Sequence, residues 1–150
     1  MSRFDEAAEL FQSVDGTERL ELLLDYADRM PALPEPYDRL RAAGLGLVHE
    51  CQSPVFLLVE RGEADRVRVR GYVPEEAPTA RGFTSLLIEA FDDAPAADVA
   101  AAPADALRAL GLASLLGMQR TRGLSAVYAR LRAEAARLGS RDAGGDGAGG

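Results

Sequence analysis

The segment LVHECQSPVFLLVE, residues 47–60, contains the only cysteine and the only histidine of this 150-residue chain. Cys51 precedes a strongly apolar run and lies beside a turn that contains a proline, where the turn can present its sulfur. The thiolate form of such a side chain is a nucleophile and takes part in thiol exchange. A small, buried cysteine without chemistry is the alternative, and the pattern of this segment alone leaves both open.

His49 lies two residues before Cys51. Because the charge of histidine changes near neutral pH, His49 could take the proton of the thiol. The two side chains share a face only if both residues belong to one strand, since an intervening turn removes that relation. A Cys-His hydrolase pair is therefore weakly indicated, and a histidine at the surface is the plainer interpretation. Gln52 and Ser53 could donate hydrogen bonds to a group on the sulfur or only stabilise the turn.

Several kinds of functional site are excluded by the sequence. One cysteine and one histidine cannot alone hold a structural zinc ion or an iron-sulfur cluster. The chain has no GxGxxG or Walker A motif, and it has no lysine for a Schiff base with pyridoxal phosphate. We therefore expect neither a cofactor nor a metal in this chain.

Composition restricts the partners and the compartment. A formal charge of -7 argues against nucleic-acid binding. No apolar run approaches the ~20 residues of a membrane-spanning helix, and the acidic N-terminal residues lack the apolar centre of a signal peptide. A single cysteine permits no intramolecular disulfide, which fits a reducing cytoplasm.

Proline positions and apolar periodicity predict the elements around the cysteine. Residues 3–13 favour a short amphipathic helix, and a second helix follows the capping-box pattern that starts at Asp15. From Leu47 the period changes to that of strands, at 47–50, 55–60 and 66–73. Short connections favour antiparallel pairing, so that we expect a meander of about three strands with a turn at Cys51.

The remainder of the chain favours helices. One helix is predicted to begin at Pro78, two short ones within 92–112, and a last one over 121–138. The order of elements predicts an α+β fold, an antiparallel sheet with helices packed on one face. We expect a single domain over residues 1–138 and a Gly-rich, disordered tail over 139–150.

Arg66, Arg68 and Arg70 alternate with valines in the last predicted strand. Alternation places the three arginines on one face of the sheet. This basic stripe is either a solvated face or a docking surface for an acidic partner.

Three segments of the chain resemble the SufE family of sulfur-acceptor proteins. ECQSPVFLLVE resembles the family's active-site loop, roughly GCQSQVWL, and it follows a leucine-proline cluster, MPALPEP, as in the family. RGFTSLLIEAF looks like the family's RGLxxLLL helix. LGLASLLGMQRTRGLSAVYARLRAEA is similar to LGLxxHLSPxRxNGLxxMxxxIxxxA. The resemblance covers roughly residues 10–138 in the same order, so the chain is identified as a divergent member of the family.

The resemblance implies an α+β fold like that of the scaffold protein IscU and a role as a sulfur carrier. It implies that Cys51 takes sulfane sulfur from a SufS-like cysteine desulfurase, stimulates that enzyme, and passes the sulfur to a SufBCD-like iron-sulfur scaffold. Pyridoxal phosphate would belong to the desulfurase, and no independent turnover is expected of this chain. The competing hypothesis is a non-catalytic interaction or redox-sensing module whose cysteine carries no sulfur.

The same resemblance places the arginine of the family's last motif on Arg120, with the following glycine and leucine on Gly123 and Leu124. If the last helix begins beside the loop, Arg120 would favour the thiolate of Cys51, whereas the neighbouring Glu50 would disfavour it. Arg120 could equally brace the sheet or cap a helix. The positions that depart from the family pattern leave the identity of the partner open, and they are His49, Glu50, Pro54, Phe56, Glu76, Met118 and Arg122.

Overall fold

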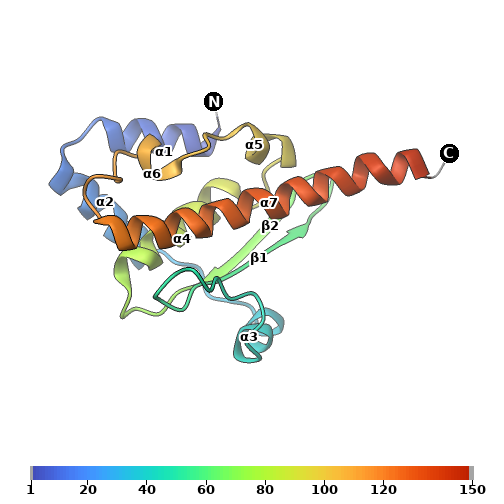
Figure 1. Cartoon of the computed structure of the whole chain (residues 1–150), viewed down its shortest axis with the longest axis horizontal. Coiled ribbons are helices and arrows are strands. Elements are labelled where there is room, and N and C mark those ends of the chain that lie inside the picture. The colour runs from blue at the N-terminus through green and yellow to red at the C-terminus, as the bar shows by residue number, and fades with distance from the viewer. Residues whose placement is uncertain (1, 149–150) are drawn as a thin grey trace.

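Helices pack mainly on one face of a small antiparallel sheet in the computed structural model, which describes the backbone of residues 2–148 and the side chains of residues 2–139 (Figure 1). The chain is therefore an α+β protein, as the sequence predicts. In chain order the elements are α1 Arg3–Gln12, α2 Gly16–Asp28, α3 Glu35–Ala42, β1 Phe56–Arg61, β2 Val67–Tyr72, α4 Pro78–Phe91, α5 Ala96–Ala101, α6 Ala106–Ala109 and α7 Met118–Ala148.

Side-chain caps and prolines set the ends of the first helices. Ser2 forms a capping box with Asp5 at the start of α1. Asp15 accepts a hydrogen bond from the backbone N–H of Glu18 at 2.9 Å, which caps α2 where the sequence predicts it. The prolines after Met30 separate α2 from α3, because proline is tolerated in the first turn of a helix but not in its interior.

The sheet has two strands within residues 2–148, and the predicted meander of about three is wrong in this detail. β1 and β2 pair antiparallel with Val59 opposite Val69. The segment 47–50 contributes only an isolated bridge between Leu47 and Phe56. The chain turns at residues 49–50 immediately after that bridge, so no further pairs with β1 can form.

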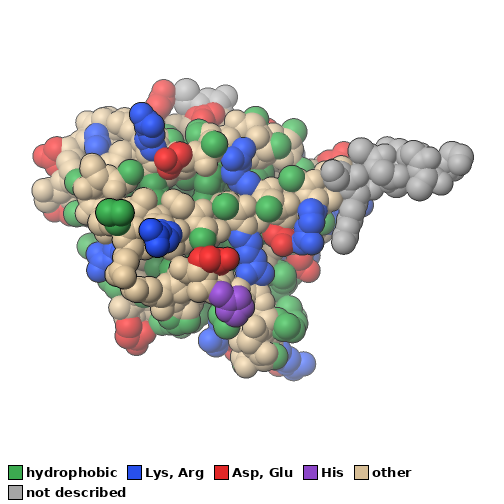
Figure 2. Space-filling model, in the orientation of Figure 1, with side chains coloured by type: hydrophobic (Ala, Val, Ile, Leu, Met, Phe, Trp, Pro, Cys, Tyr) green, Lys and Arg blue, Asp and Glu red, His purple; other side chains and the backbone are tan. Residues whose placement is uncertain are grey.

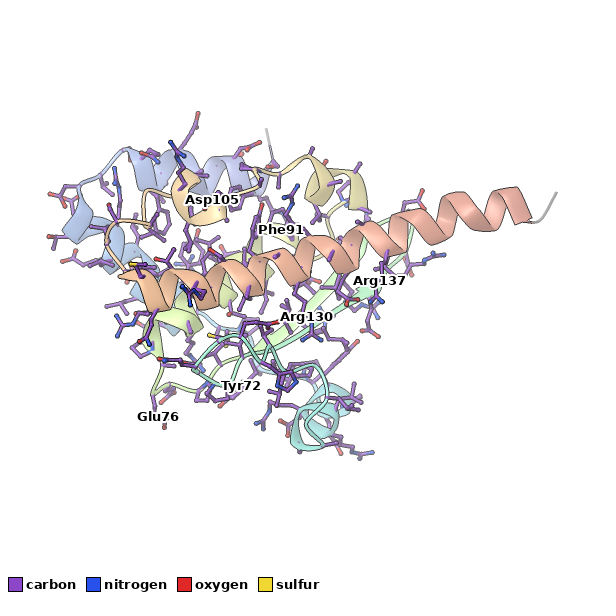
Figure 3. The ribbon with its side chains drawn as sticks, in the orientation of Figure 1. Tyr72, Glu76, Phe91, Asp105, Arg130 and Arg137 are labelled. Atoms are coloured by element: carbon purple, nitrogen blue, oxygen red, sulfur yellow. The ribbon has the colours of Figure 1, made fainter. Side chains whose placement is uncertain are left out.

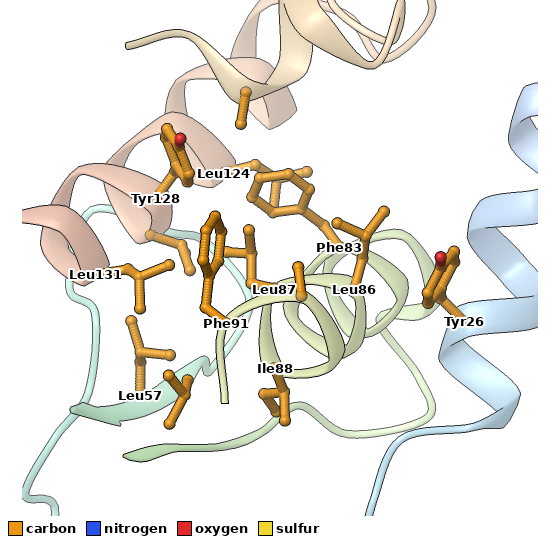
Figure 4. Packing of buried hydrophobic residues seen from close by; sticks show 14 of the residues in the cluster. Tyr26, Leu57, Phe83, Leu86, Leu87, Ile88, Phe91, Leu124, Tyr128 and Leu131 are labelled. Carbon is orange, nitrogen blue, oxygen red and sulfur yellow. The ribbon is translucent and has the colours of Figure 1, made fainter. Parts of the chain in front are cut away.

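One face of the sheet is buried under α4 and α7, as predicted. Val59, Val67 and Val69 lie on this face and are nearly inaccessible to solvent. The core continues between α4 and α7 (Figure 4) and out to α1 and α2. The ring of Phe4 stacks on Phe91 at 5.6 Å between centroids, and that of Phe11 stacks on Tyr26 at 6.1 Å. The largest fully buried side chains of the core include Phe4, Phe11, Phe56, Phe83 and Phe91.

The crossing of α2 and α4 explains the pair Arg81-Gly82, which begins the segment RGFTSLLIEAF. A Cβ atom on Gly82 would lie 2.2 Å from the carbonyl oxygen of Leu23, so that α2 and α4 can meet this closely only at a glycine. The adjacent Arg81 donates to the carbonyl oxygens of Ala27 at 3.0 Å and Val73 at 2.6 Å. This pair therefore joins α2, α4 and the end of β2.

The basic stripe lies on the other face of the sheet, and its arginines make contacts within the chain. Arg66 donates to the carbonyl oxygen of Asp93 at 2.7 Å, and Arg70 pairs with Asp92 at 3.0 Å. Arg68 is exposed, and a hydrogen bond with Tyr37 of α3 raises its pKa. The stripe is thus engaged in contacts within the chain, and its role as a docking surface stays a prediction.

α7 begins at Met118, earlier than the predicted Thr121, and its backbone is described as helical up to Ala148. It thus runs through residues 139–148, which the sequence assigns to a disordered tail, while residues 149–150 lie outside the described residues. The last core residue of α7 is Ala135, and the domain boundary at residue 138 stays a prediction. None of the helices within residues 2–148 combines the length and apolar character that a bilayer crossing requires.

Candidate functional site

Cys51 lies in a loop, residues 48–55, that we call the cysteine loop. The backbone N–H of Val48 donates to the carbonyl oxygen of Val55 at 2.9 Å, which closes the loop at its base. Just before it, Gly46 has a φ of +76°, and an added Cβ atom would lie 2.7 Å from the ring of Phe56. Glycine therefore allows the chain to turn into the loop here. As the sequence predicts, the cysteine is in the loop and not in the middle of a strand.

The thiol of Cys51 rests against the backbone of α7. A Cβ atom on Gly123, which is buried, would lie 3.2 Å from both Sγ and Cα of Cys51. Cys51 itself is half-buried and packs at the edge of the hydrophobic core. The absence of a side chain at Gly123 gives the sulfur the room that it occupies, and the sulfur is tucked against the body of the domain.

A cavity of about 220 Å³ opens beside the sulfur. The cysteine loop forms one wall, the first turn of α4 and the turn before it form another, and the first two turns of α7 form the third. Glu76, labelled in Figure 3, belongs to the turn before α4. The polar residues of the lining are Gln52, Ser53, Glu76, Thr79, Gln119 and Arg120.

The charges around this cavity favour an anion. Arg120 lines the cavity and is exposed, and its side chain makes no hydrogen bond or ion pair with any other residue in the described part of the chain. The N-terminal ends of α4 and α7 lie in the walls, and helix N-termini carry partial positive charge. Glu76 is the one opposing charge of the lining. An anionic group bound in the cavity would face Arg120 and the two helix N-termini.

The structure brings most of the predicted site residues together. Cys51, Gln52, Ser53 and Arg120 line the same cavity. His49 does not line it, because residues 49 and 50 form a turn that directs both side chains to solvent. Figure 2 shows the histidine protruding from the surface of the molecule. A role for His49 as the base for Cys51 has no geometric support, and Glu50, equally exposed, does not line the cavity either.

Sequence reasoning missed Thr79 and Gln119 of the lining and, outside it, one arginine. Arg130 of α7 donates from Nη1 to the carbonyl oxygen of Leu47 at 2.6 Å, immediately before the cysteine loop. The signal that could have found it is helical spacing. Gly123, Val127 and Arg130 follow one another at intervals of four and three residues, which places them on one face of α7.

No group of three or more histidine, cysteine, aspartate or glutamate side chains is arranged to hold a metal ion in the part of the chain that the structure describes. The donors of the cavity are one thiol, amide and hydroxyl groups, one carboxylate and one guanidinium. This set suits a covalent adduct on sulfur better than a coordinated ion.

Comparison with known proteins points to one family. Residues 5–135 match the SufE family, described as an Fe-S metabolism associated domain. Two proteins of Mycobacterium tuberculosis, from strains CDC 1551 and H37Rv, are each named uncharacterized SufE-like protein. Each is 45% identical over 122 residues, which cover 81% of this chain and 83% of the relative.

A solved structure has the same fold. It is the solution structure of a hypothetical protein from Thermus thermophilus, which superposes with a TM-score of 0.75 at 34% sequence identity. The superposition covers 92% of this chain and 96% of the other, so the similarity extends over nearly the full length of both.

Proposed function

Because this chain belongs to the SufE family, whose domain is associated with Fe-S metabolism, we propose that it is a sulfur carrier that works through Cys51. It takes sulfane sulfur from the persulfide of a SufS-like cysteine desulfurase and thereby stimulates that enzyme. It then passes the sulfur to a SufBCD-like scaffold for iron-sulfur cluster assembly. Pyridoxal phosphate belongs to the desulfurase, and we expect the exchange to take place in the reducing cytoplasm.

The observation that carries this proposal is the position of the thiol. The chain's one sulfur nucleophile lies in a loop, half-buried on Gly123, and it borders a cavity that is also lined by Arg120, whose side chain makes no ion pair in the described part of the chain. A cysteine that served only packing would not need a cavity beside its sulfur. A carrier needs that space for one additional sulfur atom and needs surroundings that accept the negative charge of a persulfide.

The transfer is a thiol exchange in which no net oxidation occurs. The Cys51 thiolate attacks the outer sulfur of the desulfurase persulfide, in line with the bond between the two partner sulfurs. A new bond forms between Sγ and that outer sulfur, and the old bond breaks. The electron pair leaves with the desulfurase cysteine, which takes up a proton. The outer sulfur thus moves to Cys51 as a persulfide, and a second exchange of the same kind delivers it.

The other residues of the cavity have supporting roles in this proposal. Arg120 stabilises the anionic sulfur before and after transfer, because it carries an unpaired positive charge in the lining. Gln52 and Ser53 can donate hydrogen bonds to the terminal sulfur, since both belong to the loop wall.

Intact-mass spectrometry tests the proposal. The protein is incubated with the cysteine desulfurase of its own organism and L-cysteine, and a mass increase of one sulfur atom on Cys51 is expected. Cys51→Ser conserves volume and hydrogen-bonding capacity, so the variant should fold, still compete with the wild type for the desulfurase, and neither gain mass nor stimulate cysteine turnover. Full stimulation by Cys51→Ser would refute the carrier mechanism and favour an interaction module.

A further inference from the structure

Two contacts of α7 in this region are with Cys51, at the cavity, and with Leu47, the residue immediately before the cysteine loop and outside the cavity lining. At one, Cys51 packs on Gly123. At the other, the Arg130 guanidinium donates to the carbonyl oxygen of Leu47. Figure 3 shows Arg130 between α7 and the loop that lies below it. The chain from Leu47 to Cys51 thus lies along one face of α7, with the Arg130 hydrogen bond at Leu47 and the sulfur packed on Gly123.

The Arg130 contact is well placed to control where Cys51 lies. Its donor is a charged group in a partly buried position, and hydrogen bonds of this kind are stronger than those between neutral groups. Its acceptor, Leu47, is bridged to Phe56, the first residue of β1. The backbone bonds of this region, from Val48 to Val55, from Cys51 to Val48 and from Leu57 to Gly46, join the loop to itself or to β1.

We propose that Arg130 is a positioning residue for sulfur transfer: through Leu47 it holds the cysteine loop docked on α7, with Sγ of Cys51 seated on Gly123 at the cavity. While the loop is docked, one side of the sulfur is covered by the helix, and small reductants reach it only from the cavity. When the bond to Leu47 opens, the loop can lift the sulfur away from Gly123 toward a partner protein. The inference rests on the proposed function, because a docked loop matters only if Cys51 carries sulfur.

The rate at which iodoacetamide alkylates Cys51 under native conditions measures loop docking directly. Arg130→Ala removes a charge-assisted hydrogen bond, which should increase the undocked population and the alkylation rate by about tenfold. Removal of a positive charge does not in itself speed alkylation of a thiol, because cations favour the reactive thiolate. An increase in rate therefore reports undocking and not electrostatics. Arg130→Lys, which keeps one charged donor, should fall between the wild type and Arg130→Ala.

Arg132→Ala is the matched control. Arg132 is also an arginine of α7 that donates to a backbone carbonyl oxygen, but its acceptor is Ala100 at 3.4 Å, away from the cysteine loop. This variant should be alkylated at the wild-type rate. Urea unfolding followed by circular dichroism shows whether the variants are folded, and if Arg130→Ala is not, Arg130→Lys alone decides. Alkylation of a folded Arg130 variant at the wild-type rate, or an equal increase in Arg132→Ala, overturns the inference.

The persulfide form gives a second measurement. After sulfur loading, Arg130→Ala should lose its persulfide to dithiothreitol faster than the wild type does, whereas Arg132→Ala should not. If the wild type takes up no sulfur at all, the proposed function fails, and the alkylation rates still decide whether Arg130 docks the loop. If sulfur is taken up and the Arg130 variants behave as the wild type in both assays, only the positioning role fails.

Discussion

Gly123→Ala is the substitution that most directly tests the contact between the Cys51 sulfur and α7. The added methyl group would lie 3.2 Å from both Sγ and Cα of Cys51. Non-bonded carbon atoms prefer about 3.5 to 4.0 Å, so the loop or the helix must move by a few tenths of an ångström or more. Since α7 is packed through Leu124 and Val127 into the core, the loop is the part that can yield. We therefore expect the cysteine loop to be displaced outward.

The expected effect on stability is small, because two contributions oppose each other. Alanine is favoured over glycine in a helix interior by about 1 kcal/mol. Overpacking at a close contact costs about 1 to 3 kcal/mol. The free energy of unfolding should thus change by between about 0 and 2 kcal/mol in the destabilising direction. The effect on Cys51 should be much larger, because all of the displacement falls on the loop that carries it.

Gly139→Ala is the control for this experiment. Gly139 belongs to the same helix, but nothing lies within 4 Å of a Cβ atom placed on it, so its substitution gains helix propensity without overpacking. Urea unfolding should show Gly139→Ala to be at least as stable as the wild type, with an unchanged rate of Cys51 alkylation. Gly123→Ala should be alkylated several-fold faster and should protect its persulfide less well. If Gly123→Ala matches Gly139→Ala in both assays, the sulfur does not rest on α7 in solution.

Two further predictions concern the cavity and the core. Arg120→Ala should slow sulfur uptake about two- to fivefold, as expected for an exposed charge, with the circular dichroism spectrum unchanged. Arg122→Ala, also exposed but outside the cavity lining, should not slow it, and equal rates for both variants would leave Arg120 without a role. Burial raises the pKa of Tyr128 to about 12, above about 10 for an unfolded tyrosine. Wild-type stability should therefore fall by about 2 kcal/mol as the pH rises from about 10 to 12. Tyr128→Phe should lack this decrease in urea unfolding, and parallel curves for the two proteins would contradict it.

Local patterns were enough to predict most of the helices. Pro78 begins α4, and polar residues cap the starts of α1 and α2. Such start signals depend only on the few residues around them, so they can be identified in the sequence. The prediction of a third strand was wrong for an equally local reason, which the alternation of apolar residues does not reveal. Gly46 in a left-handed conformation and the turn at residues 49–50 leave Leu47 a single bridge to β1.

The candidate site was predicted only in part, because it is assembled from distant segments. Family resemblance singled out Cys51, Arg120 and Gly123, but neither spacing nor composition says that Gly123 lies against Sγ. The Arg130 contact joins residues 83 positions apart, and an arginine in a helix has no signature that identifies its acceptor. His49 was favoured by its closeness in sequence, yet a single turn is enough to remove it from the cavity.

A sulfur carrier has two opposing requirements, since the persulfide must be shielded between encounters and released within them. The attachment of the cysteine loop can satisfy both. The sheet beneath it is held by a continuous ladder from Phe56–Tyr72 to Arg61–Val67, whereas the tip of the loop is flanked by two contacts with α7, the Arg130 bond to Leu47 and the packing of Cys51 on Gly123. Val48 and Val55, at the base of the loop, are buried in the core. Opening these two contacts costs much less than opening the sheet, so the loop can undock while the domain stays folded. A partner that binds the undocked loop more tightly than the docked one shifts this equilibrium without unfolding the carrier. The same contacts that protect the persulfide thus set how much binding free energy a partner must supply to reach it.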